Sequence, residues 1–330
     1  MPKSSNKIFI GIDIGGTKIL TAAFSHKFKK LGFIKEKAEF NQGEKKFFEI
    51  IHESIKSLLK DIDFKMNDVA AIGIGCAGMI EYPKGFVKLS PNIQFLTQYP
   101  LAAKMKKIYN KTTFVENDVN AGLYGEFCFG AAKGYDNVVG VFPGTGVGGA
   151  IIIDGKLYRG HGGAAGEIGH MFLNLEGLTF DSRYIGTLEA LIGRLTIAAE
   201  AGKLAAQQKA KHLYQEAGTD INKIKSKVIA RSLEKHDKEI QRLITRKAQI
   251  LGLGMANLAN ILNPELFVLG GGLIDAMGDW IIPTTQKTFY KMAMSPNTDG
   301  VHIKRSELSD LAVAMGAAKL AQEMWEDHRS

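Results

Sequence analysis

Two stretches of the chain share one pattern: an apolar, β-branched run, a turn of glycine and threonine, and a second apolar run. The first is Lys7–Phe24, KIFIGIDIGGTKILTAAF, and the second is Asn137–Leu157, NVVGVFPGTGVGGAIIIDGKL. Each predicts two antiparallel strands joined by a tight turn. Because glycine permits φ > 0, such a turn can aim several backbone N–H groups outward, which suits a phosphate. We therefore expect two strand–turn–strand units that hold a polyphosphate from both sides.

Elsewhere the pattern alternates between strand-like apolar runs and amphipathic helical stripes. This alternation predicts an α/β protein in which helices pack on sheets. Residues 187–262 have an almost wholly helical pattern, which ends at Asn263-Pro264. No linker or low-complexity segment separates the halves, so we expect domains that share a hinge and an intimate interface. The expected strands are 30–39, 69–75, 111–116 and 266–269, and the expected helices are 44–62, 118–129 and 310–325.

The composition is ordinary for a water-soluble globular protein. Of 330 residues, 45% are hydrophobic and 23% are charged, and no apolar run approaches the ~20 residues of a membrane-spanning helix. Residues 1–7 are too short and polar for a signal peptide, so we expect a cytoplasmic protein. Two cysteines, Cys76 and Cys128, are too few for a disulfide framework or a cysteine-based zinc cluster. We interpret both as small core residues.

A formal net charge of +8 raises nucleic acid as a partner. The excess lysines are scattered, and the densest clusters, at 27–30 and 104–107, lack aromatic or glycine interleaving. They are typical of solvated faces. We therefore expect no nucleic-acid partner, although a basic surface helps to attract anionic nucleotides.

Two segments match G-x-G-x-x-G, at Gly73–Gly78 and Gly144–Gly149. A dinucleotide site needs a helix directly after the last glycine. Ala150–Ile153 is strand-like instead, and Met79–Ser90 contains proline, so we exclude a Rossmann site; no G-x-x-x-x-G-K-[ST] is present either. An isolated glycine pair is more often a plain tight turn. Two Gly/Thr turns, with a third glycine run at Gly270–Gly272, favour nucleotide binding.

Asp118 is a candidate for acid–base chemistry. Phosphoryl transfer to an alcohol needs donors around the phosphates, Mg²⁺ and a carboxylate that accepts the hydroxyl proton. Asp118 follows an apolar strand and opens the expected helix 118–129, where clefts form in α/β sheets. The alternative is that Asp118 is only a helix N-cap.

A second polar pair, Glu167 and His170, lies in the glycine-rich segment Gly162–His170, GGAAGEIGH. Glycine lets the backbone approach a ligand closely, and a carboxylate and an imidazole can bind sugar hydroxyls. The alternative is an ordinary surface pair. The glycines around the pair favour a binding role.

Together these residues resemble the ROK family of sugar kinases, relatives of glucokinase within the actin/hexokinase/Hsp70 ATPase fold. The matching segments run over almost the whole chain in the family's order, which makes the resemblance highly specific. They are DIGGTK at 13–18, SPNI at 90–93, ENDVNAGLYGE at 116–126, PGTGVGGA at 143–150, GAAGEIGH at 163–170, TLEA at 187–190 and LANILNPELFVLGGGL at 258–273.

The resemblance implies an α/β, two-domain actin-like ATPase (ribonuclease H-like) fold with a cleft between the domains. The expected small domain is residues 1–117 completed by 308–330, and the expected large domain is 118–307, with the helical segment 187–262. The family's usual habit implies a homodimer.

The resemblance also implies a role for each matched residue. Asp118 is the catalytic base that deprotonates a sugar hydroxyl, most often the 6-OH, and Asp13 reaches Mg²⁺ through water. The implied sugar-binding residues are Asn92, Asn117, Asp118, Glu167, His170 and Glu189. The implied ATP-binding residues are Asp13, Gly15, Gly16, Thr17, Lys18, Thr145 and Gly146 near the phosphates, and Gly271 near the adenosine.

The sequence departs from the family in two places. The family commonly has a cysteine-rich zinc loop after E-x-G-H, but here Phe180, Ser182 and Thr187 stand where cysteines are expected. One imidazole, that of His170, cannot form a closed tetrahedral zinc site, so we expect no structural zinc. Ala77 replaces the usual proline in G-C-A-G. Both changes leave the sugar preference open.

The sequence thus predicts an ATP- and Mg²⁺-dependent hexose kinase, glucokinase-like, that phosphorylates the 6-hydroxyl of glucose or a related hexose. The alternatives are a kinase of N-acetylmannosamine, N-acetylglucosamine or fructose, and a non-catalytic ROK sugar sensor. ROK repressors carry an N-terminal helix-turn-helix domain, for which the twelve residues before Asp13 leave no room. The hexose, the choice between ATP and polyphosphate as donor, and the oligomeric state stay open.

Overall fold

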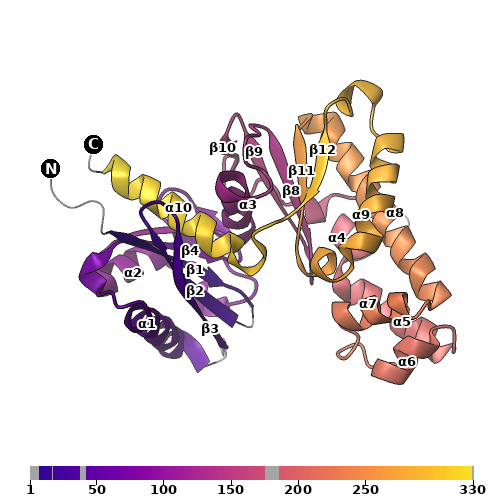
Figure 1. The fold of residues 1–330 in the computed structure, drawn as a ribbon, viewed down its shortest axis with the longest axis horizontal. Helices are drawn as coiled ribbons and strands as arrows, with labels where there is room; N and C mark the ends of the chain where they lie inside the picture. The colour runs from indigo at the N-terminus through magenta and orange to yellow at the C-terminus, as the bar shows by residue number, and fades with distance from the viewer. Residues whose placement is uncertain (1–6, 17, 38–41, 175–185, 329–330) are drawn as a thin grey trace. The chain divides into compact units, whose positions relative to one another are not determined.

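The chain forms two compact units in a computed structural model (Figure 1). The structure describes residues 7–16, 18–37, 42–174 and 186–328. The first unit comprises Met1–Gly134, Leu157–Ala165 and Glu307–Ser330, and the second comprises Tyr135–Lys156 and Gly166–Ser306.

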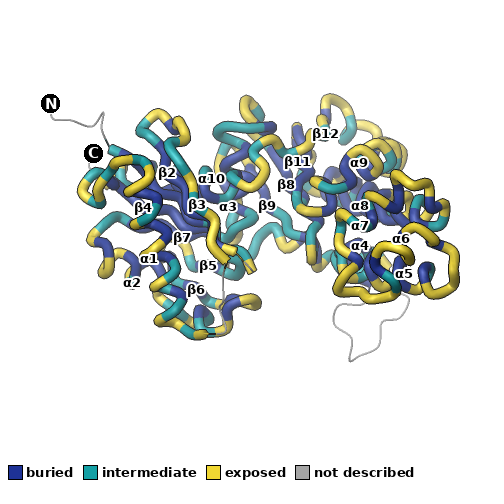
Figure 2. Tube along the Cα trace, turned by 60° about the horizontal axis from the view of Figure 1, so that its bottom comes forward, coloured by how far each residue is buried: buried dark blue, intermediate teal, exposed yellow. Residues whose placement is uncertain are grey.

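The first unit is built on a five-stranded mixed sheet whose central strands are buried (Figure 2). Its strands are β1 (Ile8–Ile14), β2 (Lys18–Ser25), β3 (Lys30–Lys37), β4 (Val69–Cys76) and β7 (Thr112–Asn117), in the order β3-β2-β1-β4-β7; a separate pair is β5 (Met79–Glu81) and β6 (Phe86–Leu89). β1 and β2 are antiparallel and form the first predicted strand–turn–strand unit, whereas β1, β4 and β7 run parallel. The predicted strands at 69–75 and 111–116 are confirmed, and that at 30–39 is confirmed up to Lys37, since residues 38 and 39 lie outside the described residues.

Helices cover the two faces of this sheet. They are α1 (Gly43–Asp61), α2 (Leu101–Tyr109), α3 (Asp118–Phe129) and α10 (Ala312–Asp327). The predicted apolar stripe of α1 is buried through Phe47, Ile51 and Ile55, in one core with Ile10 and Ile12 of β1. Since side chains alternate along a strand, Gly11 faces the opposite side, where α10 lies. Burial of apolar stripes on both faces therefore fixes the sheet between two helical layers.

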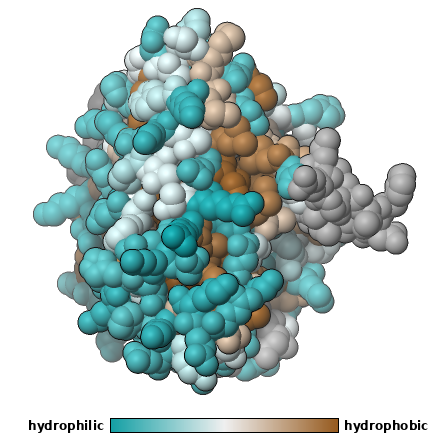
Figure 3. Space-filling view, turned by 90° about the vertical axis from the view of Figure 1, so that its right-hand side faces the viewer, coloured by the Kyte–Doolittle hydropathy of each residue, from teal (hydrophilic) through white to brown (hydrophobic). Residues whose placement is uncertain are grey.

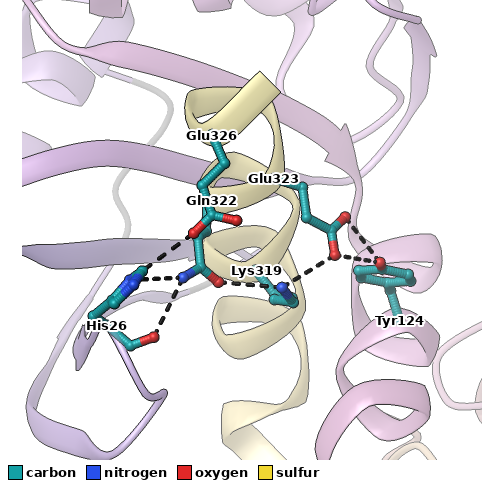
Figure 4. Close-up of polar contacts among 6 residues, drawn as sticks. All are labelled: His26, Tyr124, Lys319, Gln322, Glu323 and Glu326. Atoms are coloured by element: carbon teal, nitrogen blue, oxygen red, sulfur yellow. Dashed lines mark hydrogen bonds and ion pairs between the residues drawn. The ribbon is translucent and has the colours of Figure 1, made fainter. Parts of the chain in front are cut away.

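A polar network along α10 joins it to α3 and to His26, in the turn after β2 (Figure 4). The hydroxyl of Tyr124 donates to Glu323, 2.8 Å away, and the Lys319 ammonium lies 3.2 Å from the same carboxylate. The Gln322 amide donates to Nδ1 of His26 at 3.0 Å. These bonds satisfy the polar groups that α10 brings to the interface, so the helix is held in one register.

Gly73 allows α10 to lie directly on the sheet. A Cβ at position 73 would stand 1.9 Å from the carbonyl oxygen of Ala317, and one at Gly11 would stand 1.8 Å from that of Ala314. Both clashes are with backbone, which cannot rotate away. The first G-x-G-x-x-G match thus reflects close packing, and β5 follows it in place of a helix, as the exclusion of a Rossmann site requires.

We expect Gly73→Ala to destabilise the protein by about 1–3 kcal/mol or more, because α10 must move off the sheet to admit the methyl group. Urea unfolding measures this loss. Gly162→Ala is the matched control, since a Cβ at Gly162 meets nothing within 4 Å. Equal stabilities of the two variants would show that the α10 contact is not tight.

The second unit contains a five-stranded sheet in the order β10-β9-β8-β11-β12 and a group of helices. Its strands are β8 (Val138–Pro143), β9 (Val147–Ile153), β10 (Lys156–Leu157), β11 (Leu266–Leu269) and β12 (His302–Arg305). Its helices are α4 (Leu188–Ile192), α5 (Arg194–Ala206), α6 (Lys211–Ala217), α7 (Ser226–Glu234), α8 (Lys238–Leu262) and α9 (Gly272–Met292). β8 and β9 are antiparallel, as predicted for the second strand–turn–strand unit.

The helical segment 187–262 is confirmed as α4 to α8. α8 ends where Asn263 adopts φ 43° before Pro264, because a left-handed residue followed by proline cannot continue a helix. α9 was not predicted. Its sequence contains Pro283, and its backbone is kinked at Met277, so neither composition nor periodicity signals one long helix.

The compact units differ from the predicted domains at residues 118–134, at residues 157–165 and at Glu307. α3 and residues 157–165 belong to the first unit, whereas the predicted boundary at 117 placed them in the large domain. α3 packs on α10 so closely that a Cβ at Gly125 would stand 2.3 Å from the Ala312 carbonyl oxygen. Compactness alone does not define domains, so the predicted bounds stay a prediction.

The surface of the second unit is mainly polar. The face drawn in Figure 3 is mostly hydrophilic, with apolar residues gathered near its middle. Among the helices of the described residues, none is long and apolar enough to span a bilayer. The exposed large apolar side chains of the second unit include Leu195, Tyr214, Ile221, Ile261, Trp280, Tyr290, Met292 and Met294.

Candidate active site

Polar side chains of the first unit gather at one edge of its sheet. Because β1, β4 and β7 are parallel, their carboxyl ends meet there, with Ile14 paired to Cys76 and Cys76 paired to Asn117. Asp13 precedes the last residue of β1, and Asp118 follows β7 directly. The topology therefore brings together two acidic side chains that lie about 100 residues apart in the sequence.

The N-cap of α3 is Asn117, so the reading of Asp118 as only a helix cap is wrong. The Asn117 side-chain oxygen accepts hydrogen bonds from the backbone N–H groups of Val119, at 2.9 Å, and Asn120, at 3.1 Å. Asp118 is the first residue of the helix, and its carboxylate accepts from Val119 at 3.0 Å. A helix N-terminus favours an ionised carboxylate. The Asp118 carboxylate is thus placed on the first turn of α3, at the sheet edge.

Asn117 also holds the loop after β4. Its side-chain amide donates to the carbonyl oxygen of Gly78 at 3.0 Å. With the oxygen engaged in capping and one amide hydrogen bonded to the loop, one amide hydrogen is left for a ligand. The side chain expected to bind sugar therefore also has two structural bonds.

Asp13 is the most perturbed acid at this edge. Burial raises the pKa of its carboxyl group from 3.8 to about 7, with a further rise from the negative charge of Asp118 and a smaller opposing effect of Lys18. The pKa of the Cys76 thiol rises to about 12, first through burial and then through the charges of Asp118 and Asp13. Cys76 is thus an inert core thiol, as expected, and the two carboxylates act on each other.

Lys18 and Asp310 join this edge to β3. The Lys18 ammonium lies 3.4 Å from one carboxylate oxygen of Asp310, and that of Lys35 lies 2.5 Å from the other. The hydrogen bond from Lys35 is the main reason that the pKa of Asp310 lies below its ordinary value. Lys18 stands beside the first glycine turn with its charge partly balanced.

The first glycine turn is closed by a hydrogen bond from the Gly15 N–H to the Lys18 carbonyl, at 3.1 Å. A Cβ at Gly16 would stand 4.0 Å from the Asn92 amide nitrogen, so the structure brings Asn92 to this turn. Thr17 lies outside the described residues. Neither glycine has φ > 0, so the expected reason for glycine here is wrong.

At the second glycine turn, a side chain packs directly on Gly146. Gly144 and Gly146 also lack positive φ. A Cβ at Gly146 would stand 2.1 Å from a carboxylate oxygen of Glu189, and the same oxygen accepts from the Val147 N–H at 2.8 Å. Thr145, at the tip, is exposed. Sequence reasoning gave Glu189 a sugar-binding role and missed this contact, for which the sequence carries no signal.

Glu167 and His170 form an exposed pair. The imidazole Nε2 lies 3.7 Å from the Glu167 carboxylate, and the two side chains are 48% and 61% exposed, respectively. The nearby glycines let the backbone of this segment lie directly against another backbone segment. A Cβ at Gly169 would stand 2.2 Å from the Val147 carbonyl oxygen. The glycines thus place this segment against β9 and leave the pair accessible.

Gly271 has φ 82° and caps the N-terminus of α9. A Cβ there would stand 2.8 Å from the carbonyl oxygen of Pro143, at the end of β8. Only glycine fits both the left-handed backbone and this approach. The third glycine run therefore joins the start of α9 to the strand that leads into the second turn.

Two of the three residues that stand where the family has zinc-binding cysteines, Phe180 and Ser182, lie outside the described residues. Thr187 is buried, and its hydroxyl caps α4 by accepting from Ala190 at 3.2 Å. Among the described residues, no group of three or more His, Cys, Asp or Glu side chains could hold a metal ion. The expected absence of zinc stays a prediction.

A magnesium site needs fewer protein ligands than a structural zinc site. Mg²⁺ commonly keeps several waters and binds one or two carboxylates together with substrate phosphates. The Asp13 carboxyl fits this demand, because the raised pKa that burial and Asp118 impose on it is relieved by a nearby cation.

Sequence reasoning missed a buried ion pair beside Asp118. Nε of Arg159 donates to Glu116 at 2.6 Å, and the guanidinium lies over the Tyr82 ring, 4.2 Å from its centre. The other Glu116 oxygen accepts from the Asn120 amide at 3.1 Å. Arg159 and Glu116 are 43 residues apart, so no local pattern reveals them. The pair fixes the start of α3 and thereby Asp118.

Two α/β units, each with a five-stranded mixed sheet and a glycine turn on a strand pair, define the two-domain architecture of actin-like ATPases. The family model of the ROK family matches residues 9–324. The chain belongs to the ROK family.

Both kinases and repressors are similar to the chain. It is 32% identical over 317 residues to a glucokinase of Streptomyces coelicolor, covering 95% of this chain and 97% of the relative. A crystal structure of a ROK family glucokinase from Streptomyces griseus, in complex with glucose and AMPPNP, superposes with a TM-score of 0.81 at 28% identity, covering 96% of this chain and 99% of that one. A xylose repressor of Caldicellulosiruptor bescii is 28% identical over 93% of this chain and 76% of the repressor.

Proposed function

We propose that the protein is an ATP- and Mg²⁺-dependent hexose kinase that phosphorylates the 6-hydroxyl of glucose or a related hexose. The observation that carries the proposal is the Asp118 carboxylate, which stands on the first turn of α3 at the sheet edge beside Asp13. Similarity to glucokinases over almost the full chain supports it.

In this proposal Asp118 accepts the proton of the attacking hydroxyl, which makes the oxygen a better nucleophile. Asp13 would hold Mg²⁺ through water, and the bound metal would supply charge neutralisation at the phosphates. The Thr145 hydroxyl and the backbone N–H groups of both glycine turns bind phosphate oxygens, with Lys18 as a nearby cation. Several polar groups matched to sugar hydroxyls reject analogues, because an absent hydroxyl leaves a group unpaired. These groups are Asn92, Asn117, Glu167, His170 and Glu189.

A coupled assay of ADP release over a panel of hexoses tests the proposal. We expect release that depends on both Mg²⁺ and sugar, with glucose the best substrate, and ³¹P NMR should show a 6-phosphate product. The panel includes mannose, fructose, N-acetylglucosamine and N-acetylmannosamine, because a kinase of N-acetylmannosamine from Vibrio cholerae is also similar to this chain, at 28% identity. Polyphosphate replaces ATP in a second series.

The outcomes separate the alternatives. Turnover with polyphosphate alone would overturn ATP as the donor, and a clear preference for another hexose would overturn glucose. If no sugar releases product from either donor while glucose still binds, the protein is a sensor and the kinase proposal fails.

A further inference from the structure

We propose that Glu189 is a positioning residue that connects sugar binding to the phosphate turn, so that a bound hexose tightens the binding of the nucleotide. The inference deepens the proposed function and rests on it. It concerns the turn Gly144–Val147, called the phosphate turn here, and the segment Glu167–Met171, called the sugar segment; both belong to the second unit.

The phosphate turn is shaped around the Glu189 carboxylate. One oxygen, Oε2, accepts from the Val147 N–H at 2.8 Å. The same oxygen occupies the space that a Cβ at Gly146 would need, 2.1 Å from that position. The Oε2 atom of Glu189 thus both accepts a hydrogen bond from the turn and fills the space beside Gly146. A methyl group at position 146 would therefore displace this carboxylate from the turn.

The backbone around α4 supports the same turn. The Arg194 N–H donates to the Gly144 carbonyl oxygen at 3.0 Å, and a Cβ at Gly193 would stand 3.1 Å from the Thr145 carbonyl oxygen. The end of α4 and the start of α5 therefore lie directly against the turn. A shift of α4 moves the backbone that the proposed function assigns to phosphate.

α4 is fixed at both of its ends. At its start, the Leu188 N–H donates to the Met171 carbonyl oxygen at 2.8 Å, which ties the helix to the sugar segment. At its end, the buried Lys247 ammonium donates to the Leu191 carbonyl oxygen at 2.8 Å and pairs with Glu200 at 2.5 Å. Glu189 therefore stands on a short helix that joins the sugar segment to the phosphate turn.

The second oxygen of the same carboxylate has capacity for a ligand. Glu189 is half-buried, and its Oε1 accepts no hydrogen bond from any residue that the structure describes. A carboxylate has about four lone-pair sites and can accept from two groups at once. A sugar hydroxyl on Oε1 holds Oε2 against Val147. Immobilising this carboxylate before the nucleotide arrives removes part of the ordering cost of the turn.

The coupling is measured by titration calorimetry of AMPPNP with and without saturating glucose. A typical coupling free energy corresponds to a 5–150-fold change in affinity, and glucose affinity must change by the same factor when AMPPNP is bound. We expect the wild-type protein to bind AMPPNP at least fivefold more tightly with glucose. In Glu189→Gln this factor should fall close to one, because a neutral amide is a weaker partner for both the hydroxyl and the N–H.

Two further variants separate coupling from sugar binding. Gly146→Ala keeps the carboxylate but displaces it from the turn, and we expect the coupling to fall while glucose still binds. Glu167→Gln is the matched control. It removes a carboxylate of the sugar segment that, among the described residues, pairs with His170 and not with the turn, so glucose affinity should fall while the coupling at saturating glucose persists.

The results distinguish this inference from the proposed function. A wild-type protein that binds neither glucose nor AMPPNP would overturn both. Binding of both ligands without coupling, or full coupling in Glu189→Gln and Gly146→Ala, would overturn the role of Glu189 alone. A loss of coupling in Glu167→Gln equal to that in Glu189→Gln would also overturn it, because the effect would then follow any weakened sugar contact.

Discussion

Asp118→Asn should lower kcat for hexose phosphorylation by about 10²–10⁴, the usual loss when a general base is removed. Asparagine keeps the size of the side chain but cannot accept the hydroxyl proton. The fold should persist, because Asn117 and not Asp118 caps α3. Glucose affinity should change little, since the other hydroxyl contacts remain. Steady-state kinetics and calorimetry measure the two effects separately.

Asp61→Asn is the matched control, an exposed aspartate at the end of α1, and it should keep wild-type kcat. A near wild-type kcat in Asp118→Asn would mean that another group takes the proton. A large loss of glucose affinity with an unchanged kcat would assign Asp118 to binding.

Asp13→Asn should stabilise the metal-free protein at neutral pH while abolishing most of its Mg²⁺-supported activity. Folding raises the pKa of Asp13 from 3.8 to about 7, so an ionised carboxyl disfavours the folded state by up to about 4 kcal/mol. Asparagine mimics the protonated form and escapes this penalty. Sites tuned for chemistry often reduce stability in this way.

The sign of the pH dependence follows from linkage. Below about pH 4, Asp13 is protonated in the folded and the unfolded protein, so wild type and Asp13→Asn should be equally stable. Between pH 4 and 7 the unfolded chain loses the proton first, and wild type loses stability relative to the variant. Above pH 7 the difference stays constant. Urea unfolding of both proteins from pH 4 to 9 without divalent metal measures it.

The same experiment in an Asp118→Asn background adds a control. Without the charge of Asp118, one cause of the raised pKa of Asp13 is gone, so the gain from Asp13→Asn should shrink. A gain that is equal at every pH would show that the effect comes from packing and not from the titration of Asp13.

The fold was largely predictable because its elements carry local periodic signals. Both strand–turn–strand units and the helix at 118–129 follow from alternation and helical spacing. The helices α2 and α9 could not be predicted in this way, because α2 is short and α9 contains Pro283. Local patterns also could not show that Gly11 and Gly73 are glycine because a helix about 240–300 residues later lies on them.

The sequence predicted which residues belong to the candidate site, but not the contacts that those residues make. Motif order placed Asp118 and Glu189 among the candidates, since each stands in a segment that matches the family. Tertiary packing determines three contacts of the site. They are the capping hydrogen bonds of Asn117, the close approach of the Glu189 carboxylate to Gly146 and the Arg159–Glu116 ion pair. Such contacts join residues tens of positions apart, and no local propensity encodes them.

The position of α10 in the chain orders events during synthesis. β7 is complete at Asn117, but α10 begins only at Ala312, so at about 5–20 residues per second the ribosome needs roughly 10–40 s to make the helix that covers the first sheet. Throughout that interval the face that carries Gly11, Gly73 and Phe9 lacks its partner, including Trp325, whose ring stands 5.8 Å from that of Phe9. All strands and helices of the second unit are therefore synthesised before α10, the helix that completes the first unit. A nascent chain of this protein therefore lacks the α10 cover on one face of its first sheet until the last helix leaves the ribosome.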